Sequence, residues 1–159
     1  MINIRTGFGY DVHQLAEGLD FWLGGIKIDH TKGCVAHSDG DVLIHAICDA
    51  LLGAANMRDI GYHFPDNQNT YKNIDSKILL KQTIDLIATK GYQVGNIDAT
   101  IALQNPKIKN MIPQMQQVLS LVMGIDTDCL SIKATTTERL GFEVEEKGVS
   151  AYATVLICK

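Results

Sequence analysis

The stretch AHSDGDVLIHAICDALLGAA, residues 36–55, constrains the fold more than any other part of the chain. From about Asp39 to Ala55 its apolar residues cover nearly the whole circumference of a helix, which predicts a deeply buried helix. Ser38 is the predicted N-cap, with Asp41 three residues later as a short variant of the capping box. Two histidines and three aspartates lie in or beside this apolar run, and burying them is costly unless they are paired or bind a metal.

The remaining sequence alternates between strand and helix patterns. Strands are expected over residues 2–14, 96–106 (NIDATIALQNP), 129–135 (CLSIKAT) and 149–157, with a hairpin in FWLGGIKI at 21–28. Helices are expected over 75–90, with a stripe of Ile74, Ile78, Leu80, Ile84 and Ile87, and over 109–123. Residues 59–72 show no period and predict a long loop. The fold class expected is α+β: one domain over 1–159, a two-layer α/β sandwich whose mixed, mainly antiparallel sheet is covered by helices on one face.

Composition and charge exclude several classes of protein. The chain has 159 residues, a net charge of −4 and a sequence pI near 5.6, which argues against nucleic-acid binding by general electrostatics. Four cysteines lie far apart without a CxxC pair, which predicts reduced thiols rather than disulfides or a thiolate zinc site. The N-terminus lacks an apolar signal core, and no run approaches the roughly 20 apolar residues of a membrane span. We therefore expect a cytoplasmic protein.

Three residues have the chemistry of a metal site. Asp11 and His13 lie two apart in a predicted strand and therefore point to the same side. His45 lies on the predicted buried helix, on one face with Asp41 and Asp49. An Asp/His/His set with one open position is typical of a catalytic zinc site, and Asp49 is the candidate to steady an imidazole through its other ring nitrogen. The alternatives are a surface Asp-x-His pair and a core histidine bonded to Asp41 or Asp49.

Three further stretches favour phosphate or nucleotide chemistry. His37 and Ser38 precede the predicted helix, whose N-terminus favours an anion such as phosphate; the alternative is that Ser38 is a plain cap. In KATTTERLGF, residues 133–142, hydroxyls suit phosphate oxygens and Glu138 suits a hard cation such as Mg²⁺; the alternative is a simple helical turn. QNPKIKN, residues 104–110, either cups a planar base or is an ordinary connection.

Taken together and in this order, GYDVH, AHSDGDVLIHAICDALLGAA, DIGYHFPD, QNPK with IPQM, and KATTTERLGF resemble the 2-C-methyl-D-erythritol 2,4-cyclodiphosphate synthase family of the non-mevalonate isoprenoid pathway. The resemblance covers nearly the whole chain. It implies a phosphorus–oxygen lyase whose substrate is 4-diphosphocytidyl-2-C-methyl-D-erythritol 2-phosphate. In the reaction that the resemblance implies, the 2-phosphate would attack the β-phosphorus, CMP would leave and a cyclodiphosphate would form. The resemblance also implies a homotrimer with active sites at subunit interfaces. Because the sequence shows no transit segment, we expect a bacterial cytoplasm rather than a plastid.

The resemblance also implies a role for individual residues. Asp11, His13 and His45 would bind zinc, Glu138 would hold a second ion, Mg²⁺ or Mn²⁺, and His37 and Thr136 would stabilise the transferring phosphate. Ser38 would contact the 2-phosphate, and Asp59, Gly61, Phe64, Pro65 and Asp66 would form a loop over the erythritol moiety. The cytidine pocket and its surroundings would comprise Leu103, Gln104, Asn105, Pro106, Lys107, Ala134, Thr135, Thr137 and Phe142.

One stretch departs from the family pattern. After the motif's Phe, family members often have x-Gly-Arg-x-Glu-Gly, whereas this chain has FEVEEKG. By the resemblance, that arginine would help to bind phosphate and would line a cavity on the trimer axis. Glu145 stands where the arginine would be and Lys147 where the glutamate would be, so this role is not assigned to Glu145. We hypothesise that Lys147 supplies the missing cation. Two other functions compete with the cyclase: a zinc-dependent phosphohydrolase, and a non-catalytic trimeric protein that binds isoprenoid diphosphates.

Overall fold

The computed structural model describes residues 3–67 and 69–159, so residue 2 of the predicted first strand and residue 68 of the predicted loop lie outside it. Within the described residues, one mixed sheet has the strand order β4-β1-β7-β5-β6. Its strands are β1 (Ile4–Glu17), β4 (Lys32–Val35), β5 (Gln93–Ala102), β6 (Leu130–Thr135) and β7 (Gly148–Cys158). All neighbouring pairs are antiparallel except β5 and β6, which are parallel and joined through a helix.

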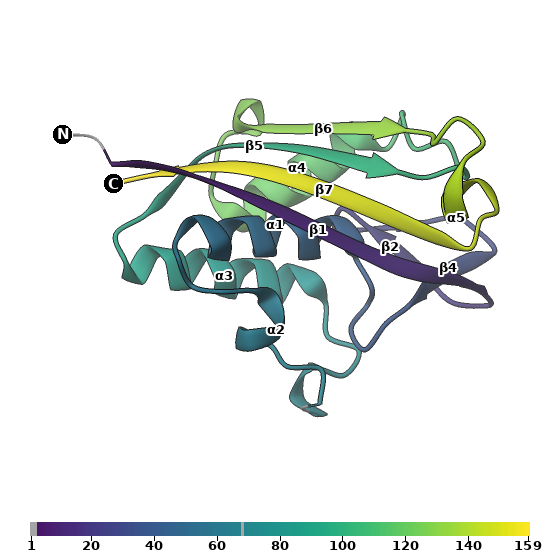
Figure 1. The fold of residues 1–159 in the computed structure, drawn as a ribbon, viewed down its shortest axis with the longest axis horizontal. Coiled ribbons are helices and arrows are strands. Elements are labelled where there is room, and N and C mark those ends of the chain that lie inside the picture. The colour runs from purple at the N-terminus through teal and green to yellow at the C-terminus, as the bar shows by residue number, and fades with distance from the viewer. Residues whose placement is uncertain (1–2, 68) are drawn as a thin grey trace.

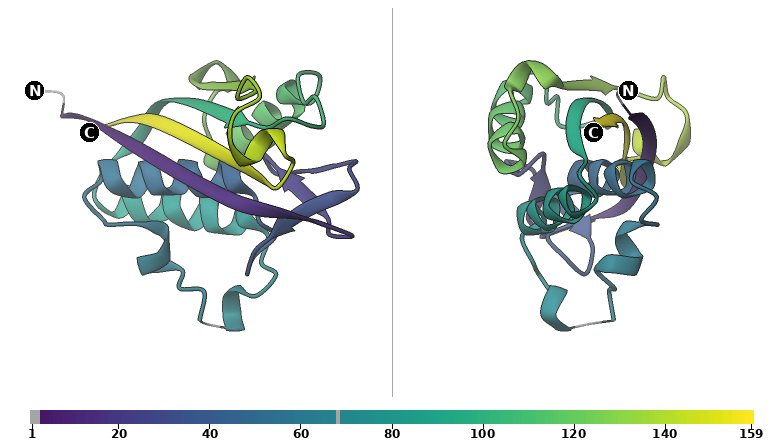
Figure 2. Two further views of the ribbon diagram at one scale, coloured as in Figure 1. Left: turned by 45° about the vertical axis from the view of Figure 1, so that its right-hand side comes forward. Right: turned by 90° about the vertical axis from the view of Figure 1, so that its left-hand side faces the viewer.

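The long helices lie together on one face of this sheet, as Figures 1 and 2 show. They are α1 (Val42–Ala54), α3 (Ser76–Thr89) and α4 (Ile112–Met123). Shorter elements are α2 (Ile60–His63), α5 (Gly141–Val144), the 3-10 turns η1 (Asn69–Tyr71) and η2 (Thr127–Cys129), and the hairpin of β2 (Phe21–Leu23) with β3 (Ile26–Ile28). The predicted α+β class, with a mixed sheet and helices packed on it, is confirmed.

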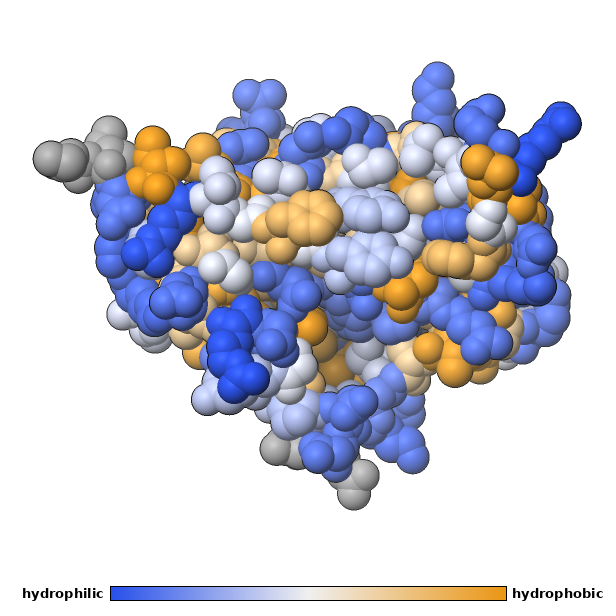
Figure 3. All heavy atoms as spheres, in the orientation of Figure 1, coloured by the Kyte–Doolittle hydropathy of each residue, from blue (hydrophilic) through white to orange (hydrophobic). Residues whose placement is uncertain are grey.

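The two faces of the sheet differ in character. Alternate residues of β7 face the helices and are buried, from Val149 to Ile157, as their spacing predicts. On the opposite face, side chains of β1 and β7 are exposed although they are apolar or aromatic: Phe8, Tyr10, Val12 and Tyr152. Tyr10 and Tyr152 are paired across the strands with ring centroids 5.1 Å apart. Figure 3 shows pale and orange side chains gathered over these strands.

Helix α1 lies in the middle of the molecule and approaches β1 unusually closely. Two glycines of β1 permit this contact, because a Cβ at Gly7 or Gly9 would lie 2.0 Å from a carbonyl oxygen of α1, that of Ala50 or Ala46 respectively. Real Cβ atoms do not approach backbone oxygens so closely, so only glycine fits. The prediction of a deeply buried helix is confirmed, and its depth depends on small residues on both elements.

The cap of α1 differs from the sequence prediction. The N-cap is Asp41, not Ser38, and its Oδ1 accepts a hydrogen bond of 3.1 Å from the Ile44 N–H. The same carboxylate accepts hydrogen bonds from the N–H groups of Gly24 (3.0 Å) and Gly25 (2.6 Å) in the β2–β3 turn. Burial raises the pKa of Asp41, and these three N–H donors oppose that effect. Asp41 therefore joins the hairpin to the helix, a long-range task that local sequence does not reveal.

Other local differences have similar causes. The helix predicted over 75–90 is α3 with Asp75 as its N-cap, but Ile78 is 47% exposed and Leu79 is buried instead. The predicted loop at 59–72 contains α2 and η1, each only one turn long. Strand β4 is absent from the prediction because its four residues show no alternation.

No helix among the described residues is long and apolar enough to cross a membrane. All four cysteines are free, as predicted.

Candidate metal centre and adjoining cavity

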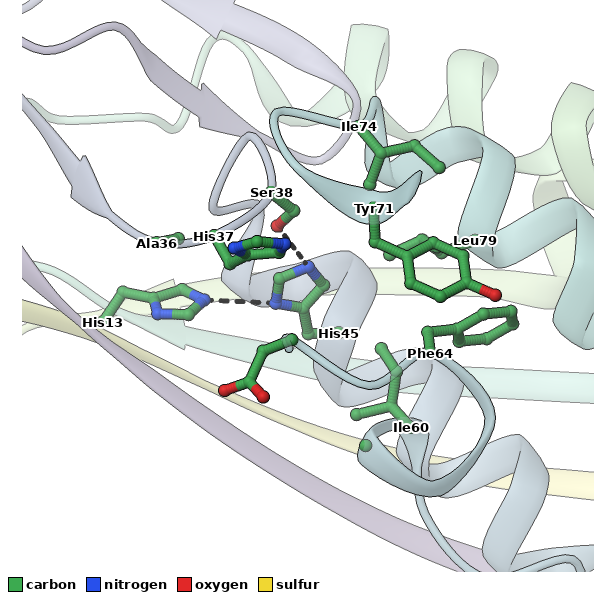
Figure 4. A pocket seen from close by; sticks show the side chains of 12 residues that line it. His13, Ala36, His37, Ser38, His45, Ile60, Phe64, Tyr71, Ile74 and Leu79 are labelled. Atoms are coloured by element: carbon green, nitrogen blue, oxygen red, sulfur yellow. Dashed lines mark hydrogen bonds between the residues drawn. The ribbon is translucent and has the colours of Figure 1, made fainter. Parts of the chain in front are cut away.

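Three ligand atoms from distant parts of the chain meet where β1 passes the first turns of α1. Asp11 and His13 lie on the face of β1 that carries Gly7 and Gly9, and His45 is on α1. The Oδ2 of Asp11 lies 3.0 Å from Nδ1 of His45 and 3.1 Å from Nε2 of His13, and the two nitrogens are 3.1 Å apart. Figure 4 shows the two imidazoles turned toward each other. The predicted cluster of Asp11, His13 and His45 thus forms in the structure.

The donor set suits a divalent metal ion. Two imidazole nitrogens and one carboxylate oxygen are ligands that Zn²⁺ takes at about 2.0–2.2 Å, and atoms spaced like these can all reach one ion over such bonds. A hydrogen atom joins only two of the three atoms, whereas a cation accepts a lone pair from each of them. Three converging protein ligands leave a further position for water or substrate, which is the arrangement of catalytic rather than structural sites.

Burial and pairing shape the charge of this cluster. Burial alone would raise the pKa of Asp11, but hydrogen bonds with His13 and His45 outweigh it and lower the pKa to about 2. For His45, burial acts to lower the pKa, yet the Asp11 carboxylate more than compensates and the pKa is raised. The cluster therefore holds a carboxylate that stays ionised at neutral pH, as a metal ligand must.

The outer nitrogen of His45 has partners other than the one expected. Its Nε2 lies 3.0 Å from Oγ of Ser76 and 3.2 Å from Oγ of Ser38. Asp49, expected to hold an imidazole, instead accepts a hydrogen bond of 2.8 Å from the N–H of Ile60 at the start of α2. A residue one helical turn beyond His45 points along α1 toward α2, whereas Nε2 points toward the N-terminus of α3. Nothing in the sequence indicates this contact of Ser76, which is simply the first helical residue after the Asp75 cap.

A cavity of about 320 Å³ opens beside the cluster (Figure 4). Its lining includes His13 and His45 together with five residues that the sequence singled out: His37, Ser38, Gly61, Phe64 and Asp66. Tyr71, Ile74 and Leu79 also line it and were not foreseen, since they belong to a loop and a helix with no chemical motif. Asp59 caps α2 through a 2.9 Å hydrogen bond from the Tyr62 N–H, and Pro65 is half-buried; neither lines the cavity.

The second group of predicted residues gathers elsewhere, where β5 and β6 end. The Leu103 N–H donates to the carbonyl of Thr135 at 3.1 Å, which joins the QNPK and KATTTE segments. Thr136 Oγ1 donates to Glu138 at 3.1 Å, and the Thr137 hydroxyl donates to the Leu140 carbonyl. None of the residues of this group lines the cavity beside Asp11, His13 and His45 within one chain. Their predicted contacts with substrate stay predictions.

The two residues of FEVEEKG that depart from the family pattern, Glu145 and Lys147, contact each other in the structure. Lys147 forms an ion pair with Glu145, and both side chains are largely exposed. Between them, Glu146 accepts a hydrogen bond of 2.5 Å from Asn105 Nδ2 and its carbonyl accepts one from Lys32. The charge of Lys147 is thus balanced by its neighbour, which weakens the hypothesis that it replaces the family's arginine.

Comparison with known proteins agrees with this geometry. The YgbB family model matches residues 4–158. A curated 2-C-methyl-D-erythritol 2,4-cyclodiphosphate synthase of Bacteroides fragilis is 72% identical over 156 residues, covering 98% of each chain. The protein of the same name from Bacteroides thetaiotaomicron is 68% identical over 158 residues, covering 99% of each chain.

Solved structures show the same fold. A 2C-methyl-D-erythritol-2,4-cyclodiphosphate synthase described as a CDP-bound form has a TM-score of 0.89 at 33% identity, covering 96% of this chain and 99% of that one. The bifunctional IspDF of Campylobacter jejuni has a TM-score of 0.95 at 40% identity, covering 99% of this chain and 43% of that one. The resemblance found in the sequence is thereby confirmed. The chain belongs to the YgbB family, that of the 2-C-methyl-D-erythritol 2,4-cyclodiphosphate synthases.

Proposed function

We propose that this enzyme forms 2-C-methyl-D-erythritol 2,4-cyclodiphosphate in isoprenoid biosynthesis, from 4-diphosphocytidyl-2-C-methyl-D-erythritol 2-phosphate. The observation that carries this proposal is the convergence of Asp11, His13 and His45 beside a cavity lined by His37 and Ser38. The high identity to curated synthases over nearly the whole chain supports the same reaction.

In this reaction an oxygen of the 2-phosphate forms a bond to the β-phosphorus. The bond between the β-phosphorus and the oxygen bridging it to the α-phosphorus breaks, and CMP leaves with that oxygen. Both reacting groups are anionic parts of one molecule, so catalysis requires positioning and charge neutralisation rather than a protein nucleophile. A zinc ion held by Asp11, His13 and His45 would supply Lewis-acid polarisation of a phosphate oxygen.

The chain's own residues position the substrate around that centre. His37 and Ser38 line the cavity and are the proposed contacts of the phosphates. Their backbone is held in place because the His37 carbonyl accepts a 2.7 Å hydrogen bond from the Asn73 N–H. Ile60, Phe64 and Leu79 give the cavity an apolar wall that suits the methylerythritol carbons. We propose that this wall covers the methylerythritol part of the substrate and excludes water from it, together with Asp59, Gly61, Pro65 and Asp66.

The nucleotide end of the substrate needs a second copy of the chain. Residues 103–107, with Ala134 and Thr135, are the proposed cytidine pocket, and Thr137 and Phe142 are further proposed substrate contacts. Glu138 is the proposed ligand of Mg²⁺ or Mn²⁺, and Thr136 is proposed to stabilise the transferring phosphate together with His37. Apart from His37, these residues do not line the cavity of their own chain, so we infer that a neighbouring subunit provides them. The exposed aromatic face of the sheet, with Phe8, Tyr10 and Tyr152, supports assembly into a homotrimer of single-domain subunits.

Metal analysis combined with an assay of CMP release tests the proposal. His45→Ala is expected to lose bound zinc and nearly all turnover. His30→Ala is the matched control, because the His30 ring packs against Phe21, with ring centroids 6.1 Å apart, and belongs neither to the cluster nor to the cavity lining. Retained zinc and activity in His45→Ala would remove the site assignment.

Phosphorus NMR of the products separates the cyclase from its competitors. The cyclase yields CMP and a cyclic diphosphate without added water, whereas a zinc phosphohydrolase yields an open-chain phosphate carrying oxygen from labelled water. Absence of any turnover with zinc and Mg²⁺ present would instead favour a non-catalytic binding protein.

A further inference from the structure

The side of His45 that faces away from the proposed metal is held by a buried serine. Ser76 is fully buried at the first position of α3, and its Oγ lies 3.0 Å from Nε2 of His45. The other ring nitrogen, Nδ1, is the one that faces Asp11 and His13. The imidazole is therefore fixed at both nitrogens, from two different sides.

An aspartate determines the direction of the hydrogen bond between Ser76 and His45. Asp39 accepts a 2.9 Å hydrogen bond from the Ser76 N–H with one oxygen and a short one from the Ser76 hydroxyl with the other. An ionised carboxylate only accepts hydrogen bonds, so the hydroxyl hydrogen of Ser76 points to Asp39. The lone pair of Ser76 Oγ is then left to accept from His45, which places the imidazole hydrogen on Nε2.

We propose that Asp39 and Ser76 are positioning residues for the metal centre, acting through His45. The series Asp39–Ser76–His45 selects the Nε2–H tautomer and so presents the Nδ1 lone pair to the shared ligand position. Hydrogen bonds of this kind at the far nitrogen of a ligand histidine orient the ring and raise its basicity. The inference rests on the metal site of the proposed function, but not on the identity of the substrate.

The surrounding backbone explains how Ser76 can hold this position. The Asp39 N–H donates to the Ile74 carbonyl at 3.1 Å, and the Asn73 N–H donates to the His37 carbonyl at 2.7 Å. The loop of residues 37–39 is thereby joined side by side with residues 73–75, which lead into Ser76 at the start of α3. His37 and Ser38, the proposed phosphate contacts, belong to the first of these two segments. The same backbone hydrogen bonds therefore fix both the orientation of His45 and the positions of His37 and Ser38 at the cavity.

The test is metal affinity, measured on the whole protein by competition with a chromogenic chelator for Zn²⁺ and Co²⁺. Ser76→Ala is expected to weaken binding by about 10- to 100-fold, the usual cost of losing such a partner. Asp39→Asn is expected to weaken it as well, because the side-chain amide can no longer accept from both donors of Ser76. The Co²⁺ absorption spectrum should change in both variants, since the ring is free to rotate.

A matched control removes a buried helix hydroxyl far from the site. Ser120 is 3% exposed in α4 and its hydroxyl donates to the Gln117 carbonyl at 3.3 Å, so Ser120→Ala should leave Zn²⁺ affinity within about two-fold. Long-range ¹H–¹⁵N NMR of the zinc-loaded protein should show His45 as the Nε2–H tautomer in the wild type. Urea unfolding of each variant identifies any that fails to fold.

The outcomes separate this inference from the proposed function. Wild-type affinity and an unchanged Co²⁺ spectrum in folded Ser76→Ala and Asp39→Asn would overturn the positioning role, whatever the activity. Weakened metal binding in these variants, in a protein that shows no cyclase turnover, would support the positioning role and contradict the proposed function. A wild-type protein that takes up neither metal would overturn both.

Discussion

Gly9 of β1 packs directly against the backbone of Ala46 in α1, so closely that a Cβ at Gly9 would lie 2.0 Å from the Ala46 carbonyl oxygen. Ala46 follows His45, and Gly9 lies two residues before Asp11 on the same face of its strand. The strand–helix distance at this point therefore decides whether His45 reaches Asp11 and His13. The GFGYDVH segment combines the spacer and two ligands in one stretch.

Gly9→Ala is expected to destabilise the fold and to weaken Zn²⁺ binding together, because the helix must move away from the strand. Overpacking of this kind costs about 1–3 kcal/mol of the free energy of unfolding. Gly53→Ala, on the same helix with open space around its Cβ position, is expected to stabilise by about 0.5–1 kcal/mol. Urea unfolding and chelator competition measure both effects. Equal stability of the two variants would contradict this packing account.

Asp41→Ala is expected to be among the most destabilising single changes in the chain. It removes the cap of α1 and leaves the buried N–H of Gly24 and the partly buried N–H of Gly25 without an acceptor, and a buried N–H left unpaired costs about 1–3 kcal/mol. Asp75→Ala removes the cap of α3. The Asp75 side chain is 46% exposed and accepts a hydrogen bond from the Lys77 N–H, so its loss should lower the free energy of unfolding by only about 1 kcal/mol. Thermal unfolding compares them; similar losses would show that the hairpin contact contributes little.

Tyr10→Glu is expected to convert the proposed trimer into monomers without unfolding the chain. Tyr10 is 43% exposed on the open sheet face, where a charge is tolerated in a monomer but not in an apolar interface. Leu121→Glu is the control, since Leu121 is 83% exposed on α4, away from this face. Light scattering coupled to gel filtration gives the mass. A trimeric Tyr10→Glu variant would place the interface on another surface.

The thiols are expected to react in two classes with a disulfide reagent at pH 8. Burial raises the pKa of Cys34 and of Cys48 to about 12, so neither forms thiolate in the native protein. Cys129 and Cys158 are half-buried and should react first, with all four reacting after denaturation. Cys48→Ser identifies the signal of Cys48, because a fast-reacting thiol that is present in the native wild type and missing in this variant would mean that α1 is less deeply buried than the structure has it.

The element types were predictable from local patterns. Gly91 and Gly124, at the ends of the predicted helices, do follow α3 and α4, and Gly24-Gly25 does form the β2–β3 turn with positive φ at both residues. The choice of Ser38 rather than Asp41 as the cap of α1 failed because both residue types cap helices equally well. The structure distinguishes them, because Gly40 lies between the two residues with a φ of 75° and Asp41 also accepts hydrogen bonds from the N–H groups of the distant hairpin.

The sequence by itself determined the alternation of strand and helix, the buried central helix and the residue types of a metal site, since these depend on periodicity and on the chemistry of single side chains. Tertiary structure alone decided which ring nitrogen of His45 faces Asp11, that Ser76 and Asp39 hold the other side, and that Asp49 serves α2 instead. Those facts depend on the separation between β1 and α1 and on the path of the chain between residues 37 and 76. Spacing along one element cannot encode the distance between two elements, which packing across the whole core sets.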